Sequence, residues 1–288
     1  MRVRIRRGVA RAYRLTCRAP GSEEIVAVRP GLTVRQFVLD WSRSGPAEAR
    51  GFLDRLPEFV DLEAKSVLAI GRGAGDLGVE VARRYARRVV AVDKVPERMN
   101  LTVARLQDEG ASLPVDIRPY TSGLTNLGDE RFDLVLAADA FRRSAADRPG
   151  RHVAALLDAM VRCLVDGGLL AIRWASPWKS PYGGFIDSRL PWAHLVFPES
   201  VIFEEFRRVR PGSDVRAFTE RMTLAQFRQL MEATRLECLH FATNVSDHRA
   251  AGVVRALGDL PGLEEYLTLN VYGVWRRATP PAGALPLR

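Results

Sequence analysis

The sequence contains few cysteines. Cys17, Cys163 and Cys238 are its only three, and they stand far apart with no CxxC pair among them. Disulfide frameworks and structural zinc sites depend on characteristic cysteine spacings. The histidines outside residues 174–199 also show no mutual spacing suited to metal binding. We therefore expect no disulfide framework and no metal site, and a reducing, cytoplasmic location.

Long apolar segments are missing as well. No run reaches the roughly 18 residues that a membrane helix needs, and the first residues, MRVRIRRGVARAYRL, lack the apolar region of a secretory signal. We expect no membrane span. The 288 residues, 47% hydrophobic and 27% charged, have an ordinary globular composition. They are enough for one large α/β domain, or for one domain with an appendage.

Lysine is nearly absent, although the net charge is +9. Of 43 basic residues, Lys65, Lys94 and Lys179 are the only lysines. Such a preference for arginine is typical of a codon bias, which weakens any inference from charge to function. A basic face would attract nucleic acid, acidic lipid or phosphorylated substrates, and arginine scattered over a solvated surface is the simpler interpretation.

Residues 1–60 are interpreted as an N-terminal extension that could act as a lid. They are rich in arginine at the start, and a turn is predicted at residues 29–31. One helix is predicted to begin at Thr33, whose hydroxyl suits an N-cap. A second short helix is predicted over residues 47–59.

Strand and helix patterns alternate over residues 61–176. Apolar runs bounded by turn residues predict strands, and apolar residues at spacings of three and four predict helices. The predicted strands cover 67–70, 88–93, 115–118, 132–137 and 169–174, and the predicted helices cover 77–85, 96–108 and 153–164. This alternation indicates βαβ units and a parallel sheet covered on both faces.

The alternation stops after Trp174. Residues 177–222 are rich in proline, glycine and aromatic residues and show no clean period. Residues 223–278 are expected to complete the sheet, with a helix capped by Thr223 and strands over 235–243 and 266–276. Residues 279–288 read as a disordered tail.

The segment VLAIGRGAGDLG, residues 67–78, is the strongest motif. A strand runs into Gly71, Gly73 and Gly75, after which a helix begins. Glycines allow a sharp turn and close approach of a ligand, and a helix N-terminus favours anionic or polar groups. Asp93 ends the next strand, where its carboxylate can accept both hydroxyls of a ribose. Many helices begin after a glycine-rich turn for structural reasons alone.

Four segments together resemble the class I S-adenosylmethionine-dependent methyltransferases, over roughly residues 60–176. They are VLAIGRGAG, AVD at 91–93, FDLVLAADAF at 132–141 and LVDGGLLAIRW at 164–174. The resemblance implies a doubly wound, seven-stranded, mostly parallel α/β sheet with an antiparallel last strand. It also implies that S-adenosyl-L-methionine lies across the ends of strands one, two and four. The cofactor-binding residues that it implies are Ile70, Gly71, Gly73, Gly75, Asp93, Lys94, Thr121, Ser122 and Ala138.

Two positions depart from the family pattern. Ala69 stands where the family usually has an acid near the methionine amino group, and Thr121 lies where an Asp near the adenine is common. These departures leave open a catalytically inactive partner protein. A dehydrogenase is a further alternative, since residues 73–78 fit GxGxxG, but the strand already ends at Ile70 and the register is wrong for it.

The aromatic segment 174–199 follows the fifth predicted strand and is expected to form the acceptor pocket. His194 is the candidate general base, and Asp139 after the fourth strand is expected to face the transferred methyl. Alternatively, His194 is hydrogen-bonded within the insertion and Asp139 caps a helix. The predicted substrate-binding residues are Trp178, Tyr182, Asp187, Arg189 and Trp192, of which Asp187 and Arg189 could instead form a local ion pair.

The sequence thus predicts methyl transfer to a hydroxyl or amine of a small molecule, such as a natural product or glycan. The basic N-terminus leaves a nucleic-acid methyltransferase as the alternative, although no RNA-binding module is recognisable. The acceptor, the methylated atom and the oligomeric state stay open.

Overall fold

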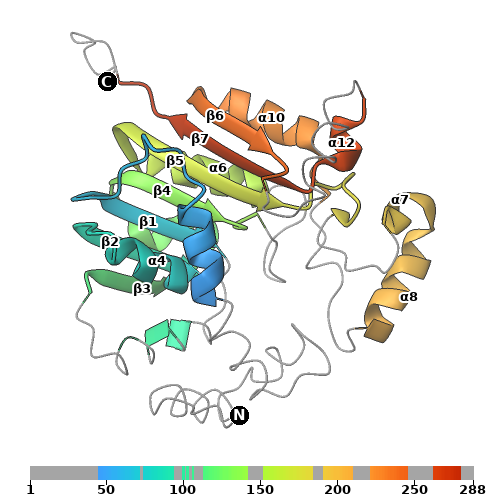
Figure 1. The fold of residues 1–288 in the computed structure, drawn as a ribbon, viewed down its shortest axis with the longest axis horizontal. Helices are drawn as coiled ribbons and strands as arrows, with labels where there is room; N and C mark the ends of the chain where they lie inside the picture. The colour runs from blue at the N-terminus through green and yellow to red at the C-terminus, as the bar shows by residue number, and fades with distance from the viewer. Residues whose placement is uncertain are drawn as a thin grey trace.

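The computed structural model describes residues 45–71, 74–93, 99–100, 102–103, 106, 113–141, 152–183, 191–209, 221–245 and 262–279. Its centre is a seven-stranded sheet in the order β3-β2-β1-β4-β5-β7-β6. Strands β1 to β5 are parallel, and β7 is antiparallel to both of its neighbours. The predicted doubly wound sheet with an antiparallel last strand is confirmed (Figure 1).

The strands are β1 (Ser66–Gly71), β2 (Arg88–Asp93), β3 (Val115–Pro119), β4 (Phe132–Ala138), β5 (Leu164–Ala175), β6 (Glu237–Thr243) and β7 (Asn270–Arg276). The helices are α4 (Ala74–Ala82), α6 (His152–Arg162), α7 (Ala193–Val196), α8 (Glu199–Val209), α10 (Leu224–Ala233) and α12 (Glu264–Leu267), with a 3-10 helix η1 (Ser122–Leu127) and a further helix over 45–53. Described residues 99–100, 102–103 and 106 are helical, within the helix predicted over 96–108.

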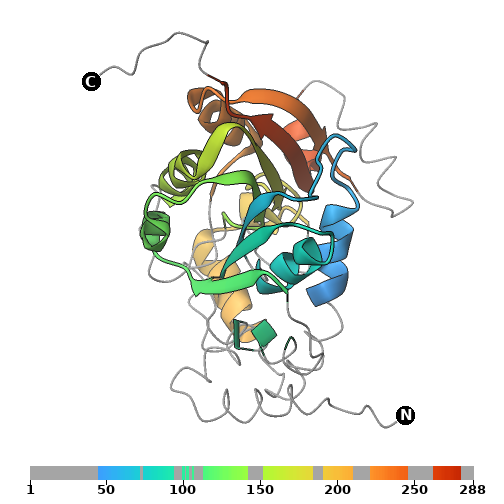
Figure 2. The same ribbon diagram turned by 90° about the vertical axis from the view of Figure 1, so that its left-hand side faces the viewer.

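Alternating residues of the strands build two separate cores. On one face, which we call the α4 face, the strands pack against α4 and the helix over 45–53. On the other, the α6 face, they pack against α6 and α10. Figures 1 and 2 show these helices on opposite sides of the sheet. Both faces are apolar because every central strand of a covered parallel sheet is hidden from water on both sides.

Glycine is required at the end of β1. Gly71 has φ 129°, and a Cβ there would lie 2.0 Å from the carbonyl oxygen of Ala138. Gly78 of α4 has a similar role, since a Cβ there would lie 2.9 Å from the Cβ of Ala91. These glycines therefore let β1 end against β4 and let α4 lie close to the sheet.

The helix that follows the glycine turn is predicted too far along the chain. It was expected over 77–85, but α4 ends at Ala82. Tyr85 has φ 64° and is 80% exposed, so it does not share the buried face of Leu77 and Val81. The chain has to turn here to enter β2, and this overrides the four-residue spacing.

The segment before the fifth strand also differs from its prediction. The helix expected over 153–164 is α6, which ends at Arg162, and β5 begins at Leu164. The Asp166–Gly168 turn lies inside β5 as an irregularity: pairing with β4 shifts between Phe132 and Leu134, and Gly167 has φ 77°. The backbone of Gly167 and Gly168 bonds to Arg277 after β7, which keeps this stretch in the sheet.

At the C-terminal side, the strand expected over 266–276 begins only at Asn270. The preceding residues form α12, and the hydroxyl of Thr268 closes it by donating to the carbonyl of Glu264 at 2.7 Å. The strand expected over 235–243 is β6. The predicted cap at Thr223 is confirmed, because Thr223 and Gln226 form a reciprocal capping box on α10.

The extension and the insertion contain structure that shapes the site. The helix predicted over 47–59 covers 45–53, and its Phe52 and Leu53 are 1% and 3% exposed in the core of the α4 face. The insertion contains α7 and α8, which Figure 1 shows beyond the end of the sheet where β4 and β5 end. The predicted helix at Thr33 and the tail after residue 279 lie outside the described residues. No described helix has both the length and the apolar character to cross a membrane.

Candidate cofactor and acceptor site

Five residues form one row across the carboxyl ends of the strands, which we call the carboxyl-edge row. They are Asp93, Gly71, Ala138, Arg173 and Tyr272. In the strand register, Gly71 pairs with Ala138, Ala138 with Arg173, and Arg173 with Tyr272. On the other side of β1, Ile70 pairs with Val92, so the next residues, Gly71 and Asp93, lie side by side. Side chains in register on neighbouring strands point to the same side, so the row faces the α4 side.

Of the predicted cofactor residues on β1, β2 and β4, the row brings together Gly71, Asp93 and Ala138, whereas the Ile70 side chain is buried in the core of the α6 face. Asp93 ends β2 and is 1% exposed. Gly71 and Ala138 present no bulky side chain beside it. Gly75 lies in α4, where a Cβ would come within 2.6 Å of Thr102 Oγ1, so this glycine is required by packing of α4. Gly73 and Lys94 lie outside the described residues.

Thr121 and Ser122 follow β3 at the same edge, and Ser122 begins η1. The Tyr120 amide donates to the Asp93 carbonyl at 2.9 Å, which holds the loop beside β2. The Thr121 hydroxyl donates to Asn126 Oδ1 at 2.7 Å and accepts from the Asn126 amide at 3.1 Å. Sequence reasoning missed Asn126, because only the folded turn brings it back to Thr121.

Asp139 is held by β5. Its Oδ2 pairs with Arg173, its Oδ1 accepts from the Ala175 amide at 3.2 Å, and its own amide donates to the Arg173 carbonyl at 2.9 Å. It has φ 50° and lies in the turn that follows β4. Asp139 therefore packs against β5 at the edge of the row, and among the described residues none of its bonds caps a helix. That it faces the transferred methyl stays a prediction.

Arg173 carries the positive charge of the row. Its side chain is 19% exposed and that of Asp139 is 17% exposed. Burial, the strongest influence, acts to lower the pKa of Arg173, but the charge and hydrogen bond of Asp139 raise it above its ordinary value. Arg173 therefore stays protonated beside an ionic partner. An arginine inside an otherwise apolar strand was the sequence signal for this residue.

Tyr272 and the helix over 45–53 close the β7 end of the row. The rings of Phe52 and Tyr272 lie 6.2 Å apart, and the charge of Glu48 acts on Arg173. Burial raises the pKa of Tyr272, and the charge of Arg173 opposes that rise only in part. The phenol is therefore neutral at physiological pH, and the end of the N-terminal extension lies next to the row.

His194 is bonded within the insertion. Its Nε2 lies 2.6 Å from the carbonyl oxygen of Trp178, and because a carbonyl only accepts, Nε2 carries the proton and donates it. The two rings meet edge to face at 4.9 Å, and Nδ1 is buried with no hydrogen-bond partner among the described atoms. Burial lowers the pKa of His194, although the bond to Trp178 opposes this. His194 is thus neutral and packed at neutral pH.

The remaining aromatic residues tie the insertion to neighbouring elements. Trp192 Nε1 donates to the carbonyl of Tyr266 in α12 at 3.0 Å. The guanidinium of Arg221 lies 5.2 Å from the ring centre of Trp178. Tyr182 is 43% exposed. Asp187 and Arg189 lie outside the described residues, so the predicted acceptor pocket is described only in part.

The carboxylate of Asp93 lies at the β2 end of the row, and Thr121 and Asn126 add polar groups beyond it, after β3. Ala69 is 0% exposed between Ala91 and Leu136, so this position lies in an apolar core. Among the described residues no group of three His, Cys, Asp or Glu side chains is placed to hold a metal ion.

Comparisons with known proteins give relatives for the domain and for the fold. Residues 67–168 match a family model described as a methyltransferase domain. A ubiquinone biosynthesis O-methyltransferase from Methylobacterium sp. (strain 4-46) is 38% identical over 84 residues, which are 29% of this chain and 32% of that protein. The chain thus spans about a third of the length of this curated relative.

Two solved structures share the fold. The [4+2]-cyclase SpnF matches with a TM-score of 0.52 and 14% identity, over 83% of each chain. An S-adenosylmethionine-dependent methyltransferase from Mesorhizobium loti matches with a TM-score of 0.52 and 15% identity, over 80% of this chain and 98% of that one. At such low identity these likenesses concern the fold. Residues 67–168 thus match a methyltransferase domain, set in a fold that the chain shares with an S-adenosylmethionine-dependent methyltransferase.

Proposed function

We propose that this protein transfers a methyl group from S-adenosylmethionine to a hydroxyl or amine of a small molecule. The observation that carries the proposal is the position of Asp93, buried at the end of β2 beside Gly71 within a methyltransferase domain. The curated relative is named for a small-molecule pathway, which supports a small-molecule acceptor.

Asp93 is proposed to accept the ribose hydroxyls, and Gly71 to let the backbone approach the nucleoside closely. Thr121 and Asn126 would border the adenine. Since Ala69 has no carboxylate, backbone carbonyls would have to hold the amino group. When bound, S-adenosylmethionine supplies a methyl group on a positively charged sulfur.

The chain's own contribution to methyl transfer is to position the acceptor, exclude water and accept a proton where one is released. Of the two proposed catalytic residues, Asp139 has the more suitable geometry. It lies at the carboxyl edge, where Arg173 and the Ala175 amide fix its carboxylate. His194 would have to act through its buried Nδ1, so we propose that it shapes the insertion containing Trp178, Tyr182 and Trp192.

The shared fold of a cyclase and a methyltransferase shows that fold alone does not decide the reaction. The apolar surroundings of Ala69 favour, as a second candidate, a partner protein that has lost catalysis. Calorimetry with S-adenosylhomocysteine separates the two: saturable binding that Asp93→Ala abolishes supports the enzyme, and absent binding contradicts it.

The acceptor class is tested next. Small hydroxyl and amine compounds and an RNA mixture are incubated with S-adenosylmethionine, and mass spectrometry detects a gained methyl group. Methylation of a small molecule that depends on Asp139 supports the proposal. Methylation confined to RNA would contradict the proposed acceptor while leaving the cofactor site intact.

A further inference from the structure

A cavity of about 280 Å³ lies at the opposite edge of the sheet from the carboxyl-edge row. Arg131 precedes β4, Arg162 ends α6, Arg235 precedes β6 and Arg277 follows β7. Because β7 runs antiparallel to β4 and β6, its end meets their beginnings, and four arginines from four elements line one cavity. We call these four residues and this space the arginine cavity.

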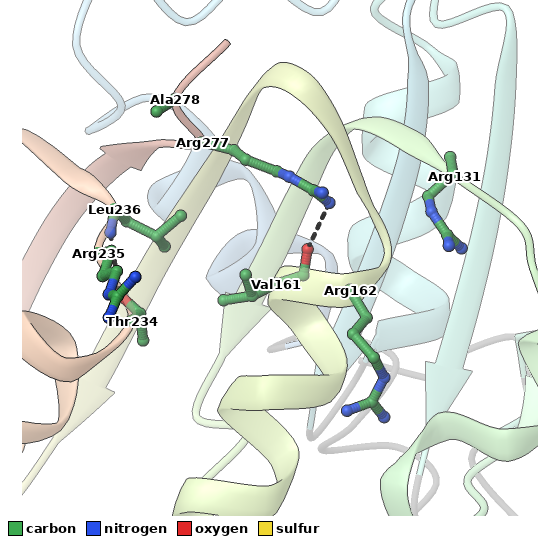
Figure 3. Close-up of a pocket in the computed structure, with 8 residues that line it drawn as sticks. All are labelled: Arg131, Val161, Arg162, Thr234, Arg235, Leu236, Arg277 and Ala278. Carbon is green, nitrogen blue, oxygen red and sulfur yellow. Dashed lines mark hydrogen bonds between the residues drawn. The ribbon is translucent and has the colours of Figure 1, made fainter. Parts of the chain in front are cut away.

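Figure 3 shows how the four arginines surround the cavity. Arg131 and Arg162 lie on one side, and Arg235 lies with Leu236 on the other. Arg277 extends between the two sides toward the carbonyl of Val161. The space is therefore bordered by cations from both sides.

Three of the four arginines have no acidic partner among the residues that the structure describes. Within the described part of the chain, no carboxylate forms an ion pair with Arg131, Arg162 or Arg235. Most arginines elsewhere in that part are paired; examples are Arg50, Arg84, Arg88, Arg118, Arg173, Arg208, Arg221, Arg228 and Arg276. The arginine cavity thus gathers positive charge that no described carboxylate pairs with.

The acids next to these arginines in sequence are bonded elsewhere. Glu130 pairs with Arg88 and Arg118, although it precedes Arg131 directly. Glu237, two residues after Arg235, pairs with Arg276. Glu130 and Glu237, although close in sequence, therefore form their ion pairs with arginines outside the cavity, whereas Asp166 pairs with Arg277 of the cavity itself.

The fourth arginine is occupied and rigid. Arg277 donates to the carbonyl oxygens of Val161 and Leu164 at 3.3 and 2.7 Å, and its Nε lies 3.2 Å from Asp166 Oδ1. It bonds to a carbonyl group in the last turn of α6, where helix polarity favours a cation, and to one at the start of β5. The contacts of Arg277 within the fold thus explain its position, whereas Arg131, Arg162 and Arg235 have no acidic partner in the described part of the chain.

The charges of Arg131 and Arg162 also act on the buried Cys163 beside them. Burial raises the pKa of this thiol, the two guanidinium charges oppose the rise, and the charge of Glu130 adds to it. Arg131, Arg162 and Glu130 therefore all lie close enough to act on Cys163.

We propose that the arginine cavity binds the diphosphate group of a small anion, at a site separate from the methyl-transfer site. Guanidinium groups match phosphate oxygens in paired hydrogen bonds. Three uncompensated cations suit an anion with several charges, and the cavity has about the volume of a small ligand site. The two sources of such a group are free pyrophosphate and a nucleotide.

The test measures binding of inorganic pyrophosphate to the whole chain by calorimetry at physiological ionic strength, where weak surface attraction is screened. Wild type should bind saturably. Arg162→Ala/Arg235→Ala should weaken binding by at least about tenfold, because two charge-assisted contacts are lost. The matched control is Arg87→Ala/Arg207→Ala, which removes two exposed arginines without ion pairs in the described chain; its binding should change less than about twofold.

Each outcome decides for or against the proposal. A nucleoside triphosphate that binds more tightly than pyrophosphate, and depends on the same two arginines, supports it and identifies a nucleotide as the source. No saturable binding, or equal losses in both double variants, overturns it. Arginine-cavity-dependent binding of RNA without binding of pyrophosphate also overturns it, in favour of a nucleic-acid surface. Unchanged affinity for S-adenosylhomocysteine in both double variants shows that the proteins are folded and separates this result from the proposed function.

Discussion

Arginines at the two ends of the strands differ in whether they have an acidic partner. We call the end with the carboxyl-edge row the carboxyl edge, and the opposite end, where the arginine cavity lies, the amino edge. At the carboxyl edge, Arg173 is 19% exposed and is paired with Asp139. At the amino edge, Arg162 and Arg235 are exposed and, within the described chain, have no acidic partner. The same residue type is part of the internal packing at one edge and is open to solvent at the other.

This difference separates two uses of charge. A buried arginine requires a partner because its desolvation is costly, so the charge of Arg173 is explained by its ion pair with Asp139. An exposed arginine is tolerated without a partner, and a group of them can attract an anion. Charge counted along the sequence cannot distinguish the two uses.

The carboxyl edge lies on the apolar core around Ala69, and Ala69→Asp should cause the largest loss of protein stability. Ala69 is 0% exposed, with Ala91 and Leu136 as its register partners. A buried carboxylate without a donor should destabilise the protein by about 4 kcal/mol or more. Urea denaturation measures this loss, and Ala69→Val controls for added volume. Recovery of stability by saturating S-adenosylhomocysteine would show instead that the carboxylate meets the ligand's amino group.

Asp93→Ala should sharpen the assignment of the cofactor to the carboxyl edge. Losing a charged acceptor of two hydroxyls should cost about 2–4 kcal/mol of binding energy, so affinity for S-adenosylhomocysteine should fall at least tenfold. Calorimetry measures it. Asp116→Ala, on the neighbouring strand, removes an exposed carboxylate and should leave the affinity unchanged. Equal affinities in wild type and a folded Asp93→Ala protein would remove Asp93 from the site.

Arg173→Met tests whether the carboxyl-edge ion pair is structural. It leaves Asp139 with the Ala175 amide alone, and should lower the free energy of unfolding by about 2–3 kcal/mol, less than for a fully buried pair. Arg173→Met/Asp139→Asn should be more stable than the two single losses predict. Additive losses in a urea double-mutant cycle would show that the two side chains are not coupled.

The buried His194 should give the protein a smaller, pH-dependent change in stability. Its pKa is lowered in the folded state, so below its ordinary value of about 6.5 the unfolded chain binds the proton more readily. Stability should therefore fall as the pH falls through that value. His194→Gln keeps a donor for Trp178 and should flatten the dependence in melting curves, whereas His240→Gln controls for losing a histidine on β6. A slope unchanged by His194→Gln would contradict the assignment.

The smallest expected effect concerns the amino edge. Asp166→Asn should release Arg277 from its ion pair and tighten pyrophosphate binding about two- to fivefold, the scale of an exposed pair. Asp116→Asn, which removes one of the two acidic partners of Arg118, is the matched control. Weaker binding after Asp166→Asn would mean that Asp166 itself takes part in holding the ligand.

Local pattern was sufficient for the strands and for part of the site. The predicted strand over 88–93 matches β2 at both ends, because a short run of β-branched residues suits a strand covered on both faces. The place of Asp93 at the end of this strand follows from the same pattern, and its part in cofactor binding stays a prediction. Tyr85, in contrast, fits a helical spacing yet lies on a turn, since the route of the chain into β2 overrides local periodicity.

Patterns among neighbouring residues were enough to predict the order of strands and helices and the acid that ends β2. They also marked a turn at Gly71, but the contact that requires glycine there is with Ala138 on β4. Only the tertiary structure decided which distant side chains meet. Arg173 joins Asp139 because β4 and β5 pair in register, and His194 reaches the carbonyl of Trp178 because the insertion folds back on itself. Four arginines surround one cavity because the antiparallel β7 returns its end to the beginning of β4 and β6. Such contacts are set by strand pairing and packing across more than a hundred residues, as between Arg131 and Arg277, and no local pattern encodes them.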